Sequence, residues 1–235
     1  MLSTLSGDGR VANIRTAHRS KLNVLVCAKS LISLPRKMQE RYDIPFISVS
    51  FYGKRDTSAA ILAIAEALGD AELIERTKKL IAREEDKLDK KLAPYRKVFQ
   101  GKKAVLNTGG NKSWSIASAL QDLGFEVVAT SVKKATEADK EKARAYLGEK
   151  GILMTNPGQE QAKIIDETGA HLLLAGGRSL FTAIKKRIAF ADVNQEKKKK
   201  SYGGYGGLLN LAEDLKNALQ NPVFNNVARR APWEK

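Results

Sequence analysis

Apolar segments with two different periodicities alternate along this chain. Short runs rich in Val, Ile, Leu and Ala are typical of buried strands, and longer segments with apolar residues three and four positions apart are typical of helices. The expected strands span residues 22–27, 44–49, 104–108, 126–130, 151–154, 171–175 and 188–193. The expected helices span residues 31–42, 58–68, 71–95, 113–123, 136–147, 159–167, 179–186 and 208–219. This alternation predicts an α/β protein in which helices cover mostly parallel sheets.

The strands are distributed unevenly along the chain, which predicts two domains of different size. Residues 101–235 contain five expected strands, enough for one complete doubly wound, Rossmann-like domain. Residues 19–100 contain only two, followed by a long charged helix that we expect to end at Pro94. Two strands form a thin sheet that needs a neighbour to cover it, so we expect a smaller, incomplete α/β domain there. Residues 1–18 show no such periodicity and predict a leader segment.

Charge and cysteine content limit the classes of ligand and compartment. Lys and Arg number 41 against 26 Asp and Glu, and the net charge of +15 favours an anionic partner such as nucleic acid, a phosphorylated ligand or a charged cofactor. The single cysteine, Cys27, excludes an intrachain disulfide framework and a multi-cysteine metal cluster built from this chain alone. It indicates a reducing compartment, so we expect a cytoplasmic protein. No apolar run is long enough to predict a membrane span, and no secretory signal is expected.

Motifs for nucleic-acid binding and hydrolysis are missing. The four lysines at 197–200 could attract nucleic acid, but aromatic residues make up only 6% of the chain and a charge run is typical of a solvated loop. We therefore do not expect nucleic-acid binding. The histidines and carboxylates form no nucleophile–base or paired-carboxylate pattern, so hydrolytic catalysis is not expected either. The glycine-rich residues 202–207 predict a flexible loop that could act as a lid.

Two turns that follow expected strands share one design. Each contains two glycines, then a basic residue and a serine at the start of a helix: Gly109 and Gly110 with Lys112, and residues 176–177 with Arg178. Glycine allows positive φ and close backbone approach, and a helix N-terminus offers free N–H groups to an anion. Since the carboxyl ends of parallel strands meet at one edge, these turns predict a basic crevice. The plainer interpretation, that glycine is common in tight turns, remains open.

Cys27 follows the first expected strand and so lies at the same kind of edge. A lone cysteine is most often a small buried apolar residue. A nearby helix start and Lys29 favour the thiolate, which is the form that binds metals. One thiolate cannot hold a single metal ion, but it can hold one end of a preassembled iron–sulfur cluster. Both interpretations stay open at this point.

Several segments of the chain resemble one known family. They include residues 8–15 (DGRVANIR), 23–30 (NVLVCAKS), 50–53 (SFYG), 108–115 (TGGNKSWS), 123–130 (LGFEVVAT) and 192–196 (DVNQE). These segments resemble the α-like E subunits of the nitrogenase cofactor-assembly scaffold, within the nitrogenase component 1 superfamily. The resemblance runs almost end to end and implies that the chain corresponds to the C-terminal part of such a subunit. It implies that a missing N-terminal domain carries the cysteines of a second cluster.

The resemblance gives roles to the residues of the expected crevice. Cys27 matches the cysteine that ligates one end of the iron-molybdenum cofactor or its all-iron precursor. Asn194 stands where the catalytic component has a histidine at the molybdenum end, which implies a cluster held at one end and therefore releasable. Lys112 stands where that component places an arginine against the anionic cluster, and Arg178 falls near its homocitrate-side lysine.

Gly109 and Gly110 complete this implied site, because they allow the cluster a close approach to the backbone. The resemblance therefore implies a scaffold that carries an iron–sulfur cofactor precursor and has no turnover of its own, although slow reduction by a loaded cluster stays open. It also implies an N-type scaffold subunit and the nitrogenase iron protein as partners, and we doubt both for a chain of this length.

The chain departs from the family pattern at several positions. Ser48 and Val49 replace an acidic residue and a glycine, Ala189 replaces a proline, and the lysines at 197–200 replace a mixed polar and aromatic loop. Such departures suggest the hypothesis of an engineered, resurfaced fragment. The alternative function is accordingly a cofactor-free fragment with no activity, in which the cluster is absent from the purified protein.

Overall fold

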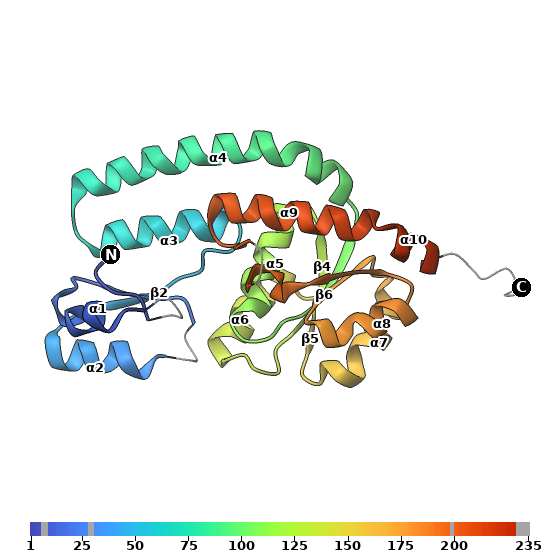
Figure 1. Ribbon diagram of the computed structural model, residues 1–235, viewed down its shortest axis with the longest axis horizontal. Helices are drawn as coiled ribbons and strands as arrows, with labels where there is room; N and C mark the ends of the chain where they lie inside the picture. Colours follow the sequence, from blue (N-terminus) through green and yellow to red (C-terminus); the bar gives the residue numbers. More distant parts are fainter. Residues whose placement is uncertain (6–8, 28–30, 198–199, 229–235) are drawn as a thin grey trace, which may run out of the picture.

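The computed structural model describes residues 1–5, 9–27, 31–197 and 200–228 of the chain. It is an α/β protein with two separate parallel sheets, a two-stranded one near the N-terminus and a five-stranded one in the remainder, as Figure 1 shows. The expected fold class is thereby confirmed. Among the described residues, no helix is both long enough and apolar enough to cross a membrane.

The two-stranded sheet forms a small lobe at one end of the molecule (Figure 1). Strand β1 (Asn23–Leu25) pairs in parallel with β2 (Phe46–Ser48), and helix α2 (Ser33–Tyr42) connects them. Helix α1 (Val11–Arg15) and the 3₁₀ turn η1 (Ala17–Arg19) precede β1, so the residues expected to form a leader contain short helical turns.

The five-stranded sheet follows the doubly wound pattern. Its strands are β3 (Lys103–Asn107), β4 (Glu126–Ser131), β5 (Ile152–Met154), β6 (Leu172–Ala175) and β7 (Ala189–Asp192). All pairs are parallel, and the order across the sheet is β5-β4-β3-β6-β7. The chain therefore moves outward from β3 to β5 and then returns to the other side of β3 with β6. Ligands of such sheets bind where the order reverses, at the carboxyl ends of β3 and β6.

Helices cover both faces of this sheet. They are α5 (Lys112–Asp122), α6 (Glu137–Leu147), α7 (Pro157–Thr168), α8 (Leu180–Lys185), α9 (Gly204–Gln220) and α10 (Pro222–Ala228). Alternate residues of β3 point to opposite faces: Ala104 and Leu106 join one apolar cluster with α5 and α9, whereas Val105 joins another with α7 and α8. This burial on both faces explains why the central strands are uniformly apolar.

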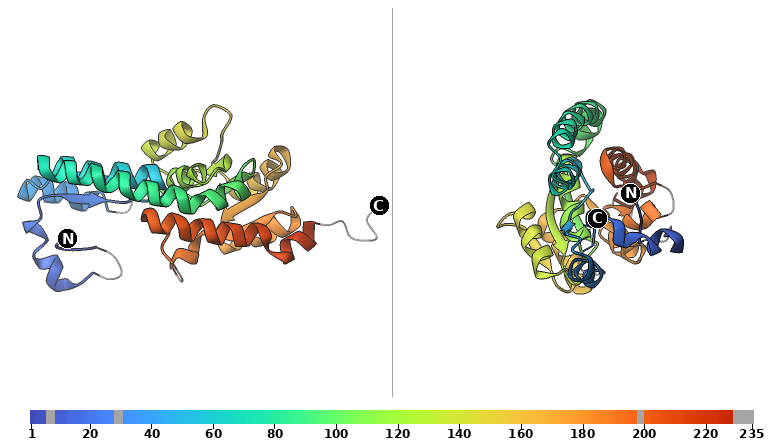
Figure 2. Two further views of the ribbon diagram at one scale, coloured as in Figure 1. Left: turned by 90° about the horizontal axis from the view of Figure 1, so that it is seen from above. Right: turned by 90° about the vertical axis from the view of Figure 1, so that its left-hand side faces the viewer.

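Helices α3 (Lys54–Ala67) and α4 (Ala71–Phe99) run as an antiparallel pair, and α4 packs along α9 (Figures 1 and 2). The prediction that the long helix ends at Pro94 is wrong, because α4 continues through it to Phe99. The fully buried Phe99 ring stacks on Phe125 with centroids 4.6 Å apart, and this packing outweighs the hydrogen bond that proline cannot make.

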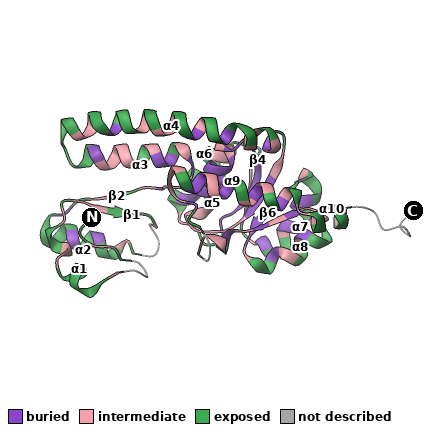
Figure 3. Cartoon of the chain, turned by 45° about the horizontal axis from the view of Figure 1, so that its top comes forward, coloured by how far each residue is buried: buried purple, intermediate pink, exposed green. Residues whose placement is uncertain are grey.

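Helix α4 also contributes side chains to the main core of the molecule. Its buried Leu88, Leu92 and Phe99 belong to the same cluster as Leu120 of α5 and Leu215 of α9. Figure 3 shows buried residues on these facing helices and exposed ones along the outer side of α4. The division into domains at residues 100 and 101 stays a prediction, and α4 shares its apolar contacts with the region that follows it.

The glycine-rich residues 202–207 do not form a flexible loop, so the expected lid is a wrong prediction. Helix α9 begins at Gly204, and Gly204 donates its N–H to the Phe51 carbonyl at 2.7 Å. Gly203 forms an antiparallel bridge with Tyr52. A Cβ at the buried Gly207 would lie only 2.6 Å from the Tyr202 carbonyl oxygen. Here glycine serves close backbone packing rather than mobility.

Candidate functional site

The two glycine turns lie next to each other at the carboxyl edge of the five-stranded sheet. Asn107 and Ala175 are paired in the register of β3 and β6, so the turns after them start side by side. Gly109 and Gly110 have φ values of 75° and 60°, which only glycine adopts without strain. The prediction that both turns share one edge is confirmed by this register.

Asn194 lies at the same edge, beside the second turn. A Cβ at Gly176 would lie 3.2 Å from the Asn194 Nδ2 atom, so the Asn194 side chain lies against this turn. Asn194 is exposed, and its backbone N–H donates to Asp192 Oδ1 at 2.9 Å, which orders the 3₁₀ turn η3 (Val193–Lys197). Arg178 is exposed in the short 3₁₀ turn η2 (Gly177–Ser179).

Cys27 approaches this edge from the other sheet. It is half-buried and comes two residues after β1 ends. The side-chain amide of Asn111, in the first glycine turn, donates to the Val26 carbonyl oxygen at 2.8 Å. This bond joins the residue before Cys27 to the residue before Lys112. Lys29, expected to favour the thiolate, lies outside the described residues.

Lys112 is present at the edge, but it is already paired. Its ammonium forms an ion pair with Glu196 of η3, and the two side chains are 23% and 13% exposed. The Tyr52 hydroxyl donates to both carboxylate oxygens of Glu196, at 2.8 and 3.1 Å. Lys112 also lies 5.4 Å from the centroid of the Tyr52 ring. Burial, and then the charge of Glu196, raise the pKa of the Tyr52 hydroxyl, so it stays a donor.

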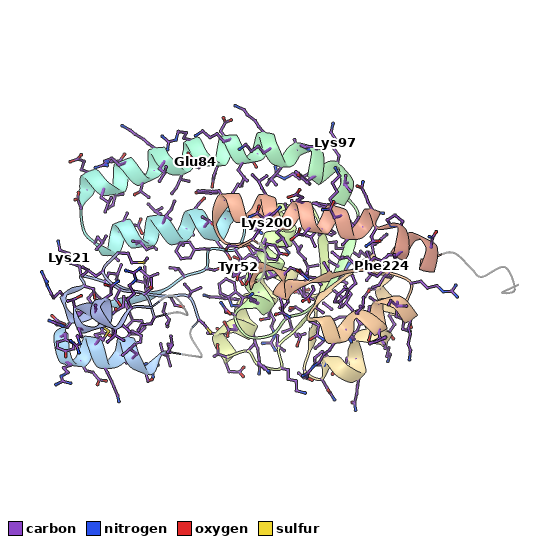
Figure 4. All side chains as sticks on the ribbon, viewed as in Figure 1. Lys21, Tyr52, Glu84, Lys97, Lys200 and Phe224 are labelled. Carbon is purple, nitrogen blue, oxygen red and sulfur yellow. The ribbon has the colours of Figure 1, made fainter. Side chains whose placement is uncertain are left out.

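Tyr52 and Glu196 were missed as site residues by reasoning from the sequence. Tyr52 lies between the small lobe and the five-stranded sheet (Figure 4). Its motif, residues 50–53, and that of Glu196, residues 192–196, both contribute to the family resemblance, and this is the one signal that could have drawn attention to them. Nothing in their spacing predicts that they meet, because 144 positions separate them.

A network of uncharged polar side chains lies at the strand ends from which the two glycine turns start. Asn107 at the end of β3 donates to Gln161 of α7 at 2.9 Å, and Gln161 donates to Thr182 of α8 at 3.2 Å. Gln161 is 6% exposed, and Ser179 beside it is 7% exposed. Buried polar groups that are mutually bonded fix one geometry, so this network holds the carboxyl ends of β3 and β6 in place.

The opposite edge of the sheet has a different character. A cavity of about 440 Å³ opens there, lined by residues that include Lys102, His171, Arg187 and Phe224. His171 lies at this amino edge and accepts a hydrogen bond from the Lys103 N–H at 3.1 Å. Burial and the neighbouring Lys102 and Lys103 lower the pKa of His171. The cavity is therefore separate from the glycine turns.

The described part of the chain contains no group of three or more His, Cys, Asp or Glu side chains placed to hold a metal ion. The carboxyl edge instead combines one thiol, two positive side chains, the Glu196 carboxylate paired with one of them, two positive-φ glycines and an amide. This set does not suit a single metal ion, which needs several ligands of its own.

Residues 1–220 match the model of the nitrogenase component 1 type oxidoreductases. The chain belongs to this family. It is 48% identical, over its full length, to the nitrogenase iron-molybdenum cofactor biosynthesis protein NifE of Nostoc sp.. It is 44% identical over 99% of its length to the protein of the same name from Klebsiella pneumoniae.

The chain spans about half the length of these relatives, 49% and 51% respectively. Its fold matches a solved structure of nitrogenase Cp1 at pH 6.5 with a TM-score of 0.84, covering 100% of this chain and 55% of that one. The sequence identity to Cp1 is 19%, so this likeness concerns the fold alone.

Proposed function

We propose that this chain acts in the biosynthesis of the nitrogenase iron-molybdenum cofactor by holding an anionic iron–sulfur precursor of that cofactor as cargo. The names of the relatives that are 48% and 44% identical support the pathway. The bond from Asn111 to the Val26 carbonyl carries the proposal for this chain, because it brings Cys27 beside the first glycine turn. A thiol remote from that turn could not share an anion with it.

Each residue of the edge has a distinct part in the proposal. The Cys27 thiolate forms the bond to one end of the cluster, and the backbone at Gly109 and Gly110 allows the cluster to lie close. Lys112 and Arg178 supply positive charge, which a multiply anionic cluster needs once water is excluded. Asn194 is a polar neighbour whose amide is a weak metal ligand.

Attachment of the cluster through a single strong bond suits a protein that releases its cargo better than one that retains a cofactor permanently. A cluster bound through one thiolate leaves when that bond exchanges, whereas one bound at both ends needs two bonds to break. In this proposal the chain performs no turnover, and binding requires neither an N-type subunit nor the nitrogenase iron protein. Those partners would matter for delivery and conversion of the cargo.

Anaerobic loading tests the proposal. The protein would be mixed with the purified all-iron precursor and desalted, then assayed for iron and by electron paramagnetic resonance. We expect about one cluster per chain in the unaltered protein, with less than about a tenth of that in Cys27→Ala, because the chain has no second cysteine.

Cys27→Ser is the matched control, since it preserves the size of the side chain and replaces the thiolate with a poorer ligand. Circular dichroism would show that both variants are folded. Uptake that is equal in all three proteins would contradict the proposal, and absence of uptake would favour the cofactor-free alternative.

A further inference from the structure

Lys112, Glu196 and Tyr52 form a compact charged cluster at the proposed site. They come from three segments far apart in sequence: the start of α5, the turn η3 and the segment between β2 and α3. Glu196 receives the ion pair from Lys112 and two hydrogen bonds from Tyr52. Both charged side chains are largely shielded from water, so the pair is stronger than an ordinary surface pair.

This pair conflicts with a simple role for Lys112 as a cation that waits for an anion. In the structure its charge is already balanced by Glu196. An anion arriving at the glycine turns meets a neutral pair and must take Lys112 from its partner. Glu196 keeps a hydrogen-bond donor after that exchange, because the Tyr52 hydroxyl still donates to it.

We propose that Glu196 is a built-in counter-ion that occupies Lys112 until a multiply charged anionic cargo displaces it, so that Glu196 sets the charge selectivity of the site. This inference rests on the proposed function for the identity of the cargo. The role of Glu196 toward anions in general can be tested without that cargo.

The selectivity follows from tethering. Glu196 is held next to Lys112 by the chain and by Tyr52, so its effective concentration exceeds that of a free anion at ordinary concentration. A free anion with one negative charge also loses translational freedom on binding, and it gains no more attraction than Glu196 already provides. An anion with several negative charges is attracted to Lys112 more strongly than the single carboxylate of Glu196 is, so it can compete for the ammonium. The pair therefore excludes small monoanions.

Inorganic pyrophosphate is a suitable probe, because it is a metal-free polyanion and does not need Cys27. We would titrate it calorimetrically, at low ionic strength, into the unaltered protein and into Glu196→Gln. Removing the counter-ion should free Lys112 and tighten binding by about three- to tenfold. Glu196→Asp, which withdraws the carboxylate by one methylene, should give a smaller gain in the same direction and guards against misfolding of the first variant.

Glu213→Gln is the matched control for the change in net charge. Glu213 pairs with Lys200 at 2.6 Å, and these two side chains are 49% and 45% exposed. We expect no gain in this variant. We also expect the gain of Glu196→Gln to vanish when Lys112→Met is added. Equal affinities in Glu196→Gln and Glu213→Gln, or a gain that survives the loss of Lys112, would overturn the inference.

Cluster loading separates this inference from the proposed function. If Glu196→Gln binds pyrophosphate more tightly in a way that depends on Lys112, but no variant takes up the cluster, the role of Glu196 is supported and the proposed cargo is rejected. If cluster uptake depends on Cys27 but Glu196→Gln binds pyrophosphate no more tightly than the unaltered protein, the proposed cargo is supported and the role of Glu196 is rejected.

Discussion

The two sheets of this molecule differ in how much of their surface is buried. In the five-stranded sheet, Val105 and Leu173 are completely buried, whereas Val24 of the small sheet is 41% exposed. The small lobe nevertheless carries Cys27, and the large sheet carries the glycine turns. Stability therefore resides mainly in one region, while the proposed site needs both. The Asn111–Val26 bond is a direct polar link between them.

The largest expected difference between the two regions is the stability lost when one apolar side chain in each is shortened to alanine. Leu92→Ala in α4 removes a fully buried side chain from the main core and should cost roughly 2–5 kcal/mol of unfolding free energy. Val24→Ala in the small lobe should change it by no more than about 0.5 kcal/mol. Urea unfolding followed by circular dichroism measures both. Similar losses would show that the lobe contributes to global stability as much as the core does.

The start of α9 provides a second test. Gly207→Ala should destabilise the protein by about 1–3 kcal/mol, because its Cβ would collide with the Tyr202 backbone. Gly206→Ala, with open space around its Cβ, should be neutral or stabilising by up to about 1 kcal/mol. Thermal unfolding of the two variants distinguishes them. If both were tolerated equally, the segment would be the mobile loop that its composition suggests.

Asn111→Ala tests the junction between the two sheets, which is the bond from Asn111 to the Val26 carbonyl. Loss of its bond to Val26 should cost about 0.5–1.5 kcal/mol locally and loosen the segment of Cys27, while the core of the large sheet keeps its stability. We expect faster alkylation of the Cys27 thiol by iodoacetamide. Asn210→Ala is the matched control, because Asn210 makes the same kind of bond to the Ser201 carbonyl, at 3.0 Å. Equal rates in the two variants would count against the junction.

The smallest expected effect is on the pH dependence of stability, through His171 at the amino edge of the five-stranded sheet. Because the pKa of His171 is lowered by burial and by Lys102 and Lys103, the unfolded chain binds a proton there more readily than the folded one. The contribution of His171 is present above its unfolded pKa of 6.5 and is lost as the pH falls below it. Unfolding curves between pH 7.5 and about 5 should show a shallower decline in His171→Gln. An unchanged slope would assign the decline to other groups.

Much of the fold could be predicted from the sequence. Each expected strand is present to within two residues at either end. The central strands β3 and β6 leave the strongest apolar signal, because they are buried on both faces. The extension of α4 past Pro94 could not be foreseen, since it depends on the contact of Phe99 with Phe125. The start of α9 was missed because glycine signals a turn as readily as it signals close packing.

The proposed site could be predicted only in part. The register of β3 and β6 brings the two glycine turns together, as parallel topology requires. The partner of Lys112 could not be predicted, because Glu196 and Tyr52 meet it through tertiary packing of three distant segments. A basic residue near a glycine turn shows where charge is placed, but not whether a neighbouring carboxylate balances it.

The most direct test of cluster binding by Cys27 is protection of its thiol from alkylation. Protein loaded anaerobically with the all-iron precursor and protein without it would be treated with iodoacetamide, and the labelled fraction would be measured by mass spectrometry. We predict that the unloaded protein is alkylated at Cys27 and that the loaded protein is protected in proportion to its iron content. Full alkylation of Cys27 with the cluster still bound would contradict the account.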